Sequence, residues 1–438
     1  MMTTLIWDDE KRGMRWFASY LLAVIPACII AYSFFIWPTI YGVKVDGDLL
    51  KDLSAASARG SGNDLLNRIY FPMLLVVTLA LIVVQGVRPT AAIRHRSIIL
   101  LGMLIGVFFL SSIWSVQSSI TIKRTLLQSF IILSVVLACV STSRPEKILH
   151  YIYIFFVGVL LVNVFVVLTV PAGPLGHEGI YPQKNSLGQC AGVASLFILL
   201  KIATARGFER LFAILMLFVV LGLLVVSKSK TSIGLFFLVP ILGLIASYIT
   251  LYFRIAAGVF MMIMMLSLLI IFWLGEAADL WTLGSIANAV FGDPTITSRT
   301  YIWEFSSEMI NRSPLFGYGF GAFWSTGVDG VAFREAPSFI KKLGQAHNGY
   351  IDIILQIGWL GFGLFIVLMI AAGNICSRAI TSSFAFGWFA ITFFIYIVLY
   401  NLLESTYFLG FEGMSVILII NMILATRLTS QSHTARSQ

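Results

Sequence analysis

The chain has 438 residues, of which 59% are hydrophobic and only 11% are charged, and its mean hydropathy is +0.94. A soluble globular domain carries about 25% charged residues, so this composition excludes an ordinary soluble protein. The net charge of +9 does not indicate nucleic acid as a partner, because the cations are spread over short polar segments between apolar runs, as membrane topology requires.

Apolar runs long enough to cross a hydrocarbon core of about 30 Å recur along the whole chain. They do not alternate between polar and apolar residues, as the strands of a membrane β-barrel would. We therefore predict an all-α polytopic membrane protein with about twelve transmembrane helices and one large outer loop that contains short amphipathic helices. The expected spans lie near residues 16–36, 69–87, 97–114, 125–140, 149–170, 186–200, 211–226, 233–250, 255–274, 347–372, 384–402 and 410–426.

Lysine and arginine in the connecting segments predict the orientation of these spans. If the N-terminus is cytoplasmic, the inner loops hold about half of the basic residues but have only roughly half the length of the outer loops. The density of cations is then about twice as high in the inner loops. We therefore expect both termini to be cytoplasmic. The expected organisation is a membrane domain with spans 1–9 over residues 1–274, a large periplasmic loop over 275–346, a membrane domain with spans 10–12 over 347–427 and a cytoplasmic tail over 428–438.

Two pairs of charged residues in the early outer segments have alternative interpretations. Asp46 and Asp48 in the first outer loop can bind a divalent cation through their carboxylate oxygens, or can belong to a solvated Asp-Gly turn. Two nearby lysines oppose a cation and favour the turn. Lys123 and Arg124, just before the fourth span, are expected to be interfacial cations that meet lipid phosphates.

Three later lysines face the outer side, against the general trend of the loops. Lys184 and Asn185 lie at the start of the sixth span, where a helix N-terminus favours anions. Lys228 and Lys230 lie in the short turn SKSKTS between the seventh and eighth spans. These lysines can extend towards lipid headgroups, but their number on one side favours a shared anionic ligand.

The longest polar interruption of the chain runs over 293–361. Apolar residues at three- and four-residue steps predict a short amphipathic helix from Ser298 to Arg312, ended by Ser313-Pro314. The sequence GYGFGAF that follows is not a dinucleotide fingerprint, because no strand precedes it. We expect a glycine-rich turn on the membrane surface, with four interfacial aromatic residues: Phe316, Phe320, Phe323 and Trp324.

His347 stands where the tenth span is expected to begin. Imidazole exchanges a proton near neutral pH, and a well-placed general base contributes about 10²–10⁴ in rate. The alternative is an ordinary residue at a helix start. Asp352 is not expected to orient His347, because two side chains five residues apart on a helix point in directions about 140° apart around its axis. Asn348 and Asp352 are four residues apart and share a helix face.

Four short motifs in 293–361 together resemble the O-antigen ligase and Wzy-type polysaccharide polymerase family, in its exopolysaccharide (succinoglycan-type) polymerase branch. They are S-R-x-x-x-W, P-L-F-G-x-G-F, A-H-N-x-Y and G-W-L-G, and the stretch K-N-S-L-G at 184–188 extends the resemblance. The resemblance implies a bacterial inner-membrane glycosyltransferase with a periplasmic active site. It would transfer a glycan from undecaprenyl diphosphate to an acceptor glycan, without a nucleotide sugar, a cofactor or a metal.

The same resemblance implies roles for individual residues. The family histidine corresponds to His347, as base for the acceptor hydroxyl, and a family arginine corresponds to Arg299, as a ligand of the diphosphate. Another family arginine falls at Lys230, which keeps the charge but loses the bidentate geometry of a guanidinium. The expected site has two catalytic residues, His347 and Arg299, and six substrate-binding residues: Lys184, Asn185, Lys228, Lys230, Asn348 and Arg312.

Several partners and alternatives remain at this point. The expected partners are the lipid-linked oligosaccharide, the acceptor glycan and membrane lipids, with a chain-length regulator and export proteins as further candidates. The alternatives are an O-antigen ligase acting on lipid A core, a flippase or transporter of lipid-linked sugars, and a metal-dependent glycosyltransferase that uses Asp46 and Asp48. Ion-coupled transporters carry ionisable residues deep in their spans, whereas Asp352, Glu404 and Glu412 lie in loops or near span ends.

Overall fold

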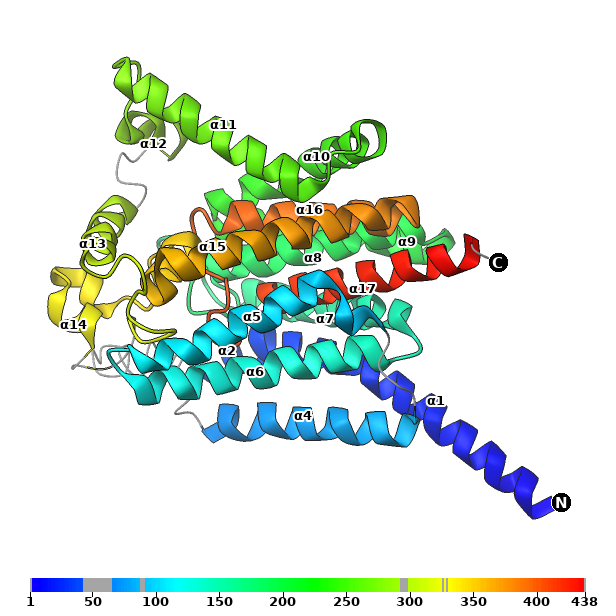
Figure 1. Cartoon of the computed structure of the whole chain (residues 1–438). Coiled ribbons are helices and arrows are strands. Elements are labelled where there is room, and N and C mark those ends of the chain that lie inside the picture. Colours follow the sequence, from blue (N-terminus) through cyan, green and yellow to red (C-terminus); the bar gives the residue numbers. More distant parts are fainter. Residues whose placement is uncertain are drawn as a thin grey trace.

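The computed structural model describes residues 2–41, 65–86, 91–291, 298–324, 327 and 330–436, and Figure 1 shows their arrangement. The predicted pair Asp46 and Asp48 lies outside these residues. The helices are α1 (Met2–Ala31), η1 (Tyr32–Ile36), α2 (Trp37–Tyr41), α4 (Leu65–Gln85), η2 (Ala91–Arg94), α5 (Arg96–Leu110), η3 (Ser111–Ile113), α6 (Ser118–Ser141), α7 (Pro145–Thr169), α8 (Lys184–Thr204), α9 (Gly207–Ser227), α10 (Lys230–Phe253), α11 (Ala257–Ala277), α12 (Leu283–Phe291), α13 (Arg299–Arg312), α14 (Val331–Glu335), η4 (Ser338–Lys342), α15 (Gly349–Arg378), η5 (Ala379–Thr381), α16 (Phe384–Tyr400) and α17 (Gly413–Arg436).

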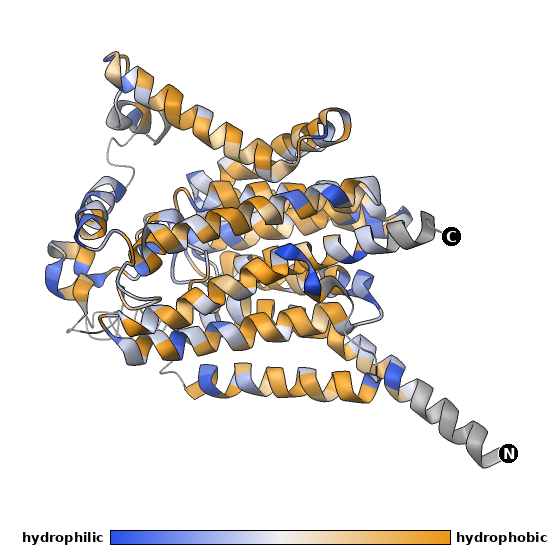
Figure 2. Ribbon diagram, viewed as in Figure 1, coloured by the Kyte–Doolittle hydropathy of each residue, from blue (hydrophilic) through white to orange (hydrophobic). Residues whose placement is uncertain are grey.

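The prediction of an all-α polytopic membrane protein is confirmed. Among the described residues, 11 helical segments are long and apolar enough to cross a membrane, and the shorter apolar helix α16 lies between two of them. Many large apolar side chains of the bundle are exposed, as expected where lipid replaces water as the solvent. Figure 2 shows that hydrophobic residues predominate along the bundle helices. The expected spans all correspond to helices, although α6 begins at Ser118 rather than near 125, and the segment begun by α15 extends to Thr381.

The polar segment forms a cap at one end of the bundle (Figure 1). We use the word cap for the described residues of 298–348, which include α13, α14 and η4. The beginning of α1 and the end of α17 lie at the opposite end. The amphipathic helix predicted over 298–312 is confirmed as α13, and its buried face belongs to a hydrophobic core of its own, separate from the core of the bundle.

Helix α15 joins the cap to the bundle and is broken at Gly358. This residue has φ 65° and ψ −176°, so the backbone leaves the helical conformation there. The break frees two carbonyl groups, which the glycine-rich turn of the cap satisfies. The Tyr318 amide donates to the Leu355 carbonyl at 2.8 Å. The Gly319 amide donates to the Gln356 carbonyl at 2.9 Å, so the turn replaces the missing helical donors.

The amide groups beyond the break find acceptors in the same turn. Trp359 donates to the Pro314 carbonyl at 2.9 Å, and Leu360 donates to the Leu315 carbonyl at 3.4 Å. A helix break close to a membrane is tolerated only where protein groups satisfy the freed backbone. The motifs P-L-F-G-x-G-F and G-W-L-G are therefore the two halves of one backbone joint.

This joint makes the prediction of interfacial aromatic residues wrong for three of the four positions. Phe320, Phe323 and Trp324 are 2%, 0% and 5% exposed, whereas Phe316 is 49% exposed. The turn docks into the helix break, so its aromatic side chains enter the protein interior. Phe320, for example, stacks on Phe108 of α5 with a ring separation of 3.9 Å.

The predicted pair of interfacial cations is also corrected. Lys123 is exposed, but Arg124 is buried and donates from Nη1 to the carbonyl oxygens of Gly321 and Trp324. A guanidinium directed into the protein cannot meet lipid phosphates. Arg124 instead ties helix α6 to the cap, because backbone carbonyls accept its hydrogen bonds.

Replacing Gly358 tests the importance of the joint. In Gly358→Ala the new Cβ would lie 2.2 Å from the Leu315 carbonyl oxygen, and the backbone conformation of Gly358, with φ 65° and ψ −176°, costs a non-glycine residue about 1–3 kcal/mol. We expect a clearly lower thermal unfolding temperature in detergent. Gly363→Ala is the matched control, because a Cβ there meets nothing within 4 Å and alanine favours a helix. Equal unfolding temperatures for the two variants would contradict this account.

Candidate functional site

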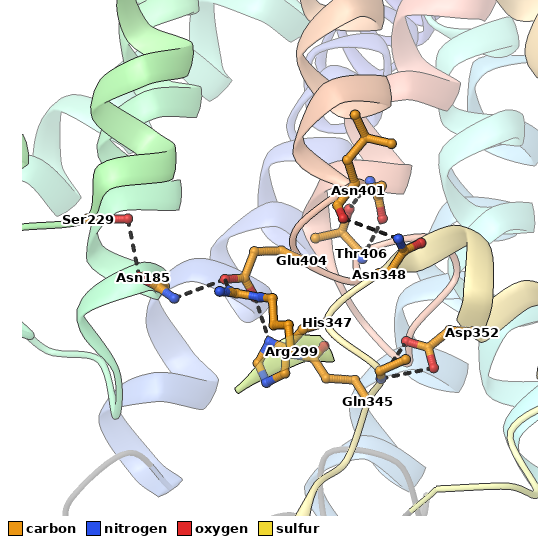
Figure 3. Close-up of polar contacts among 12 residues, drawn as sticks. Asn185, Ser229, Arg299, Gln345, His347, Asn348, Asp352, Asn401, Glu404 and Thr406 are labelled. Atoms are coloured by element: carbon orange, nitrogen blue, oxygen red, sulfur yellow. Dashed lines mark hydrogen bonds and ion pairs between the residues drawn. The ribbon is translucent and has the colours of Figure 1, made fainter. Parts of the chain in front are cut away.

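A buried carboxylate, Glu404, lies at the centre of the candidate site (Figure 3). It belongs to the loop between α16 and α17 and meets three other parts of the chain. Its Oε1 accepts hydrogen bonds from Arg299 Nη2 at 2.6 Å and from Asn185 Nδ2 at 2.9 Å. Its Oε2 lies 2.9 Å from Nδ1 of His347. Glu404 therefore brings together α13, α8 and His347, which lies two residues before α15.

The contact with Glu404 fixes the tautomer of His347. A carboxylate only accepts hydrogen bonds, so the shared proton lies on Nδ1, and Nε2 of the neutral ring keeps its lone pair. The Gln345 amide lies 3.4 Å from the same Nδ1, but the shorter, charge-assisted bond to Glu404 dominates. The His347 side chain is 18% exposed. It can therefore act as a base through Nε2 while Glu404 compensates the charge that it gains.

The protonation state of Glu404 follows from its surroundings. Burial would raise the pKa of Glu404, but the hydrogen bond and charge of His347, together with Arg299, outweigh burial and lower the pKa. The carboxyl group is therefore ionised at neutral pH. A negative charge is needed there, because Arg299 is also buried and a buried cation without a counter-ion would be strongly unfavourable.

Four helices begin at this site. Helices α8, α10, α13 and α15 start at Lys184, Lys230, Arg299 and Gly349. The first amide groups of a helix have no acceptor within the helix, and its dipole places about half a positive charge at that end. At α15 the first amides are already paired with Asn348, Asn401 and Glu404, so this helix contributes its dipole rather than unpaired donors. The converging N-termini and their cations favour an anion more than any one of them alone.

The predicted lysines gather on one side of this arrangement. Ser229, the N-cap of α10, donates from its hydroxyl to Asn185 Oδ1 at 3.2 Å and so joins α10 to α8. Lys228 and Lys230 are the exposed neighbours of the buried Ser229. Lys184 Nζ donates to the Leu175 carbonyl at 3.1 Å. The three separate lysines of the sequence therefore lie around one pair of helix ends.

Asn348 has a structural role in this arrangement. Its Oδ1 accepts from the amides of Tyr350 and Ile351 and caps α15, while its Nδ2 donates to the Leu402 carbonyl at 3.2 Å. The next residue, Gly349, approaches Asn401 so closely that a Cβ would lie 2.1 Å from its Oδ1. The A-H-N-x-Y motif thus fits tightly against the loop that carries Glu404.

Arg312 is the predicted site residue that the structure does not bring to Glu404. It lies at the far end of α13 from Arg299, about 20 Å along the helix at 1.5 Å per residue. Its guanidinium contacts Glu308 at 2.7 Å and Glu335 at 3.1 Å on the exposed side of the cap. The other predicted residues, His347, Arg299, Lys184, Asn185, Lys228, Lys230 and Asn348, lie at or next to the Glu404 cluster.

Sequence reasoning missed Glu404 as a partner of His347. Its signal was available, because Glu404 is the sole acidic residue between Phe384 and Phe411. A lone carboxylate next to a membrane helix needs a cationic or hydrogen-bonding partner. Asp352 makes no direct bond to His347, but its carboxylate accepts from the amide of Ala346, the preceding residue. Among the described residues, no three His, Cys, Asp or Glu side chains form a group that could hold a metal ion.

Two comparisons with known proteins agree with the motifs. Residues 211–366 match the family model described as O-antigen ligase, a segment that contains Lys228, Lys230, Arg299 and His347. The chain is also 31% identical over 94 residues to the exopolysaccharide production protein ExoQ of Rhizobium meliloti (strain 1021). That alignment covers 20% of this chain and 20% of the relative. The predicted resemblance to the O-antigen ligase and Wzy-type exopolysaccharide family is therefore confirmed, and the family model matches the segment that carries His347.

The lowered pKa of Glu404 predicts a pH-dependent stability. A carboxyl group with a depressed pKa stabilises the fold above its unfolded value, about 4.3 for Glu, and this stabilisation is lost as the pH falls through the folded value. Breaking a buried ion pair costs about 3–5 kcal/mol. Glu404→Gln should therefore lower the free energy of unfolding near pH 7, measured by chemical denaturation in micelles.

The difference between wild type and Glu404→Gln should shrink as the pH falls below about 4.3. Glu308→Gln provides the control, because that carboxylate belongs to an exposed ion pair with Arg312 and should change the stability by at most about 0.5 kcal/mol. A difference between wild type and Glu404→Gln that does not vary with pH would refute the assigned charge of Glu404.

Proposed function

We propose that this membrane protein is a glycosyltransferase that joins undecaprenyl-diphosphate-linked oligosaccharide repeat units during exopolysaccharide production. The single observation that carries the proposal is the pairing of His347 with buried Glu404 where four helix N-termini and several cations converge. This arrangement combines a base with an anion site. Transfer of a glycan from a lipid diphosphate requires both.

The base acts on the acceptor sugar. His347 Nε2 takes the proton of an acceptor hydroxyl as its oxygen attacks the anomeric carbon of the donor. The bond between this carbon and the diphosphate oxygen breaks, so that one glycosidic bond replaces one phosphoester bond. Glu404 stabilises the imidazolium that forms, since its Oε2 accepts the hydrogen bond from Nδ1. The proton then leaves His347 for solvent or the released diphosphate.

The cations act on the leaving group. Negative charge develops on the diphosphate as the bond breaks, and prearranged donors lower the energy of that state. Arg299 places a guanidinium beside Glu404, to which its Nη2 donates at 2.6 Å. Lys184, Lys228 and Lys230 supply further positive charge at the ends of α8, α9 and α10.

A lipid-linked donor explains why the site lies at one end of a membrane bundle. The polyprenyl chain can remain in the hydrocarbon layer while its diphosphate reaches the helix N-termini. We further propose that this end faces the periplasm of a bacterial inner membrane, with the termini in the cytoplasm, because the predicted inner loops have the higher cation density. In this topology the cap is part of the periplasmic loop proposed over 275–346.

The related ligase activity differs only in the acceptor, and the matched family is described as O-antigen ligase. The purified protein should be incubated with undecaprenyl-diphosphate-linked repeat units in the presence of EDTA. We expect a ladder of glycan chain lengths on gels. Transfer only to added lipid A core would replace the polymerase by a ligase, and no transfer to either acceptor would refute a metal-independent glycosyltransferase.

The same assay tests the roles of the two catalytic residues. His347→Ala should lower the rate of elongation by about 10²–10⁴, the usual contribution of a general base. Arg299→Lys should also lose activity, because lysine keeps the charge but lacks the guanidinium fork. His150→Gln and Arg334→Lys are the matched controls, since His150 lies on α7 and Arg334 is exposed on α14. Full activity in His347→Ala would show that this mechanism is wrong.

A further inference from the structure

The peptide backbone just before His347 is held by side chains on both sides. Ala346 is completely buried. Its carbonyl oxygen accepts a hydrogen bond from Trp303 Nε1 at 3.1 Å. Its amide donates to both carboxylate oxygens of Asp352, each at 3.1 Å. Neither the amide nor the carbonyl of Ala346 forms a helical hydrogen bond. The side chains of Trp303 and Asp352 therefore fix the orientation of its backbone.

A second tryptophan completes the arrangement. Trp324 Nε1 donates to Asp352 Oδ1 at 2.7 Å and so fixes the carboxylate that holds Ala346. The carbonyl oxygen of Trp324 accepts from Arg124 Nη1 at 3.1 Å, which connects it to membrane helix α6. We call Trp303, Trp324 and Asp352 the Ala346 clamp. It links the base of the proposed site to both the cap and the bundle.

The conformation of His347 gives this clamp its significance. His347 has φ 51°, in the left-handed region that residues other than glycine seldom adopt. Such a conformation persists only where the surroundings impose it. If the preceding peptide turned, the imidazole would leave Glu404, since its direction depends on this backbone.

We propose that Trp303, Trp324 and Asp352 are positioning residues that keep His347 against Glu404 by fixing the peptide of Ala346. The proposal rests on the proposed function, because it gives these residues a role in orienting the base. They act through the backbone, and none of their described contacts is with His347 Nε2. Their loss should therefore affect the chemical step more than donor binding.

The indole N–H groups can be removed one at a time. Trp303→Phe and Trp324→Phe each delete one donor and keep an aromatic ring. Trp114→Phe is the matched control, because Trp114 Nε1 donates to the Phe316 carbonyl at 2.9 Å, in the same glycine-rich segment but away from Ala346. We expect kcat to fall about tenfold in the two clamp variants with KM for the donor unchanged, and both constants to stay unchanged in Trp114→Phe.

A second measurement needs no glycan. Diethyl pyrocarbonate modifies accessible imidazole, so the rate of His347 carbethoxylation at one fixed pH, followed by peptide mass spectrometry, reports how far the ring is exposed. In the folded protein the His347 side chain is 18% exposed and lies against Glu404. The rate should therefore rise in the clamp variants, where the ring leaves Glu404, and stay at the wild-type value in Trp114→Phe.

The two measurements separate the possible failures. A wild-type protein that does not elongate glycans, but whose clamp variants show the faster carbethoxylation of His347, would refute the proposed function and support the clamp. Unchanged kcat and an unchanged carbethoxylation rate of His347 in Trp303→Phe and Trp324→Phe would overturn the clamp. So would losses in the clamp variants no greater than in Trp114→Phe, or losses explained by a lower fraction of folded protein in thermal unfolding.

Discussion

The site depends on one buried negative charge. Glu404 accepts hydrogen bonds from a helix of the cap and a helix of the bundle, and it contacts the histidine between them. Without this carboxylate, the nearby cation and the four helix N-termini would repel one another in a partly dehydrated environment. With it, these groups stay together and keep a net positive field for an anionic substrate. Glu404 also gives His347 a defined tautomer, so it links folding to the proposed chemistry.

A second constraint places the cap on the bundle. The break at Gly358 exposes backbone groups that would be costly to leave unpaired close to lipid. The glycine-rich turn satisfies them, and this fixes the first turns of α15, which begins two residues after His347. Arg124 adds a connection from α6 to the same turn. Backbone hydrogen bonds outside the proposed substrate site thus help to fix the position of the base, His347. Accurate placement of the reacting groups is important for a transfer reaction.

The membrane fold was predictable because long apolar runs leave few alternatives to helices in lipid. Lys184, Lys228 and Lys230 could also be singled out from the sequence as candidate ligands of an anion. They lie in expected outer segments, whereas the basic residues of the chain are denser in the inner loops. The partner of His347 was not found, because Glu404 is 57 residues away and only the packing of α15 against α16 and α17 brings the two together.

The environment of the glycine-rich turn was mistaken for a similar reason. An aromatic, glycine-rich segment next to a span is typical of a membrane surface, and the sequence contains no direct sign that α15 breaks at Gly358. The sequence likewise does not distinguish Arg124 from its exposed neighbour Lys123, because Arg124 is buried by its contacts with the cap. In both cases a non-local backbone contact decides where the side chain lies.

The central claim is that His347 and Glu404 act as one unit. The most direct measurement compares elongation rates of His347→Ala, Glu404→Gln and the double variant in the same purified system. Residues that act as a unit show non-additive losses. The account predicts that the double variant is no slower than His347→Ala alone. A double variant whose loss equals the product of the two single losses would contradict it.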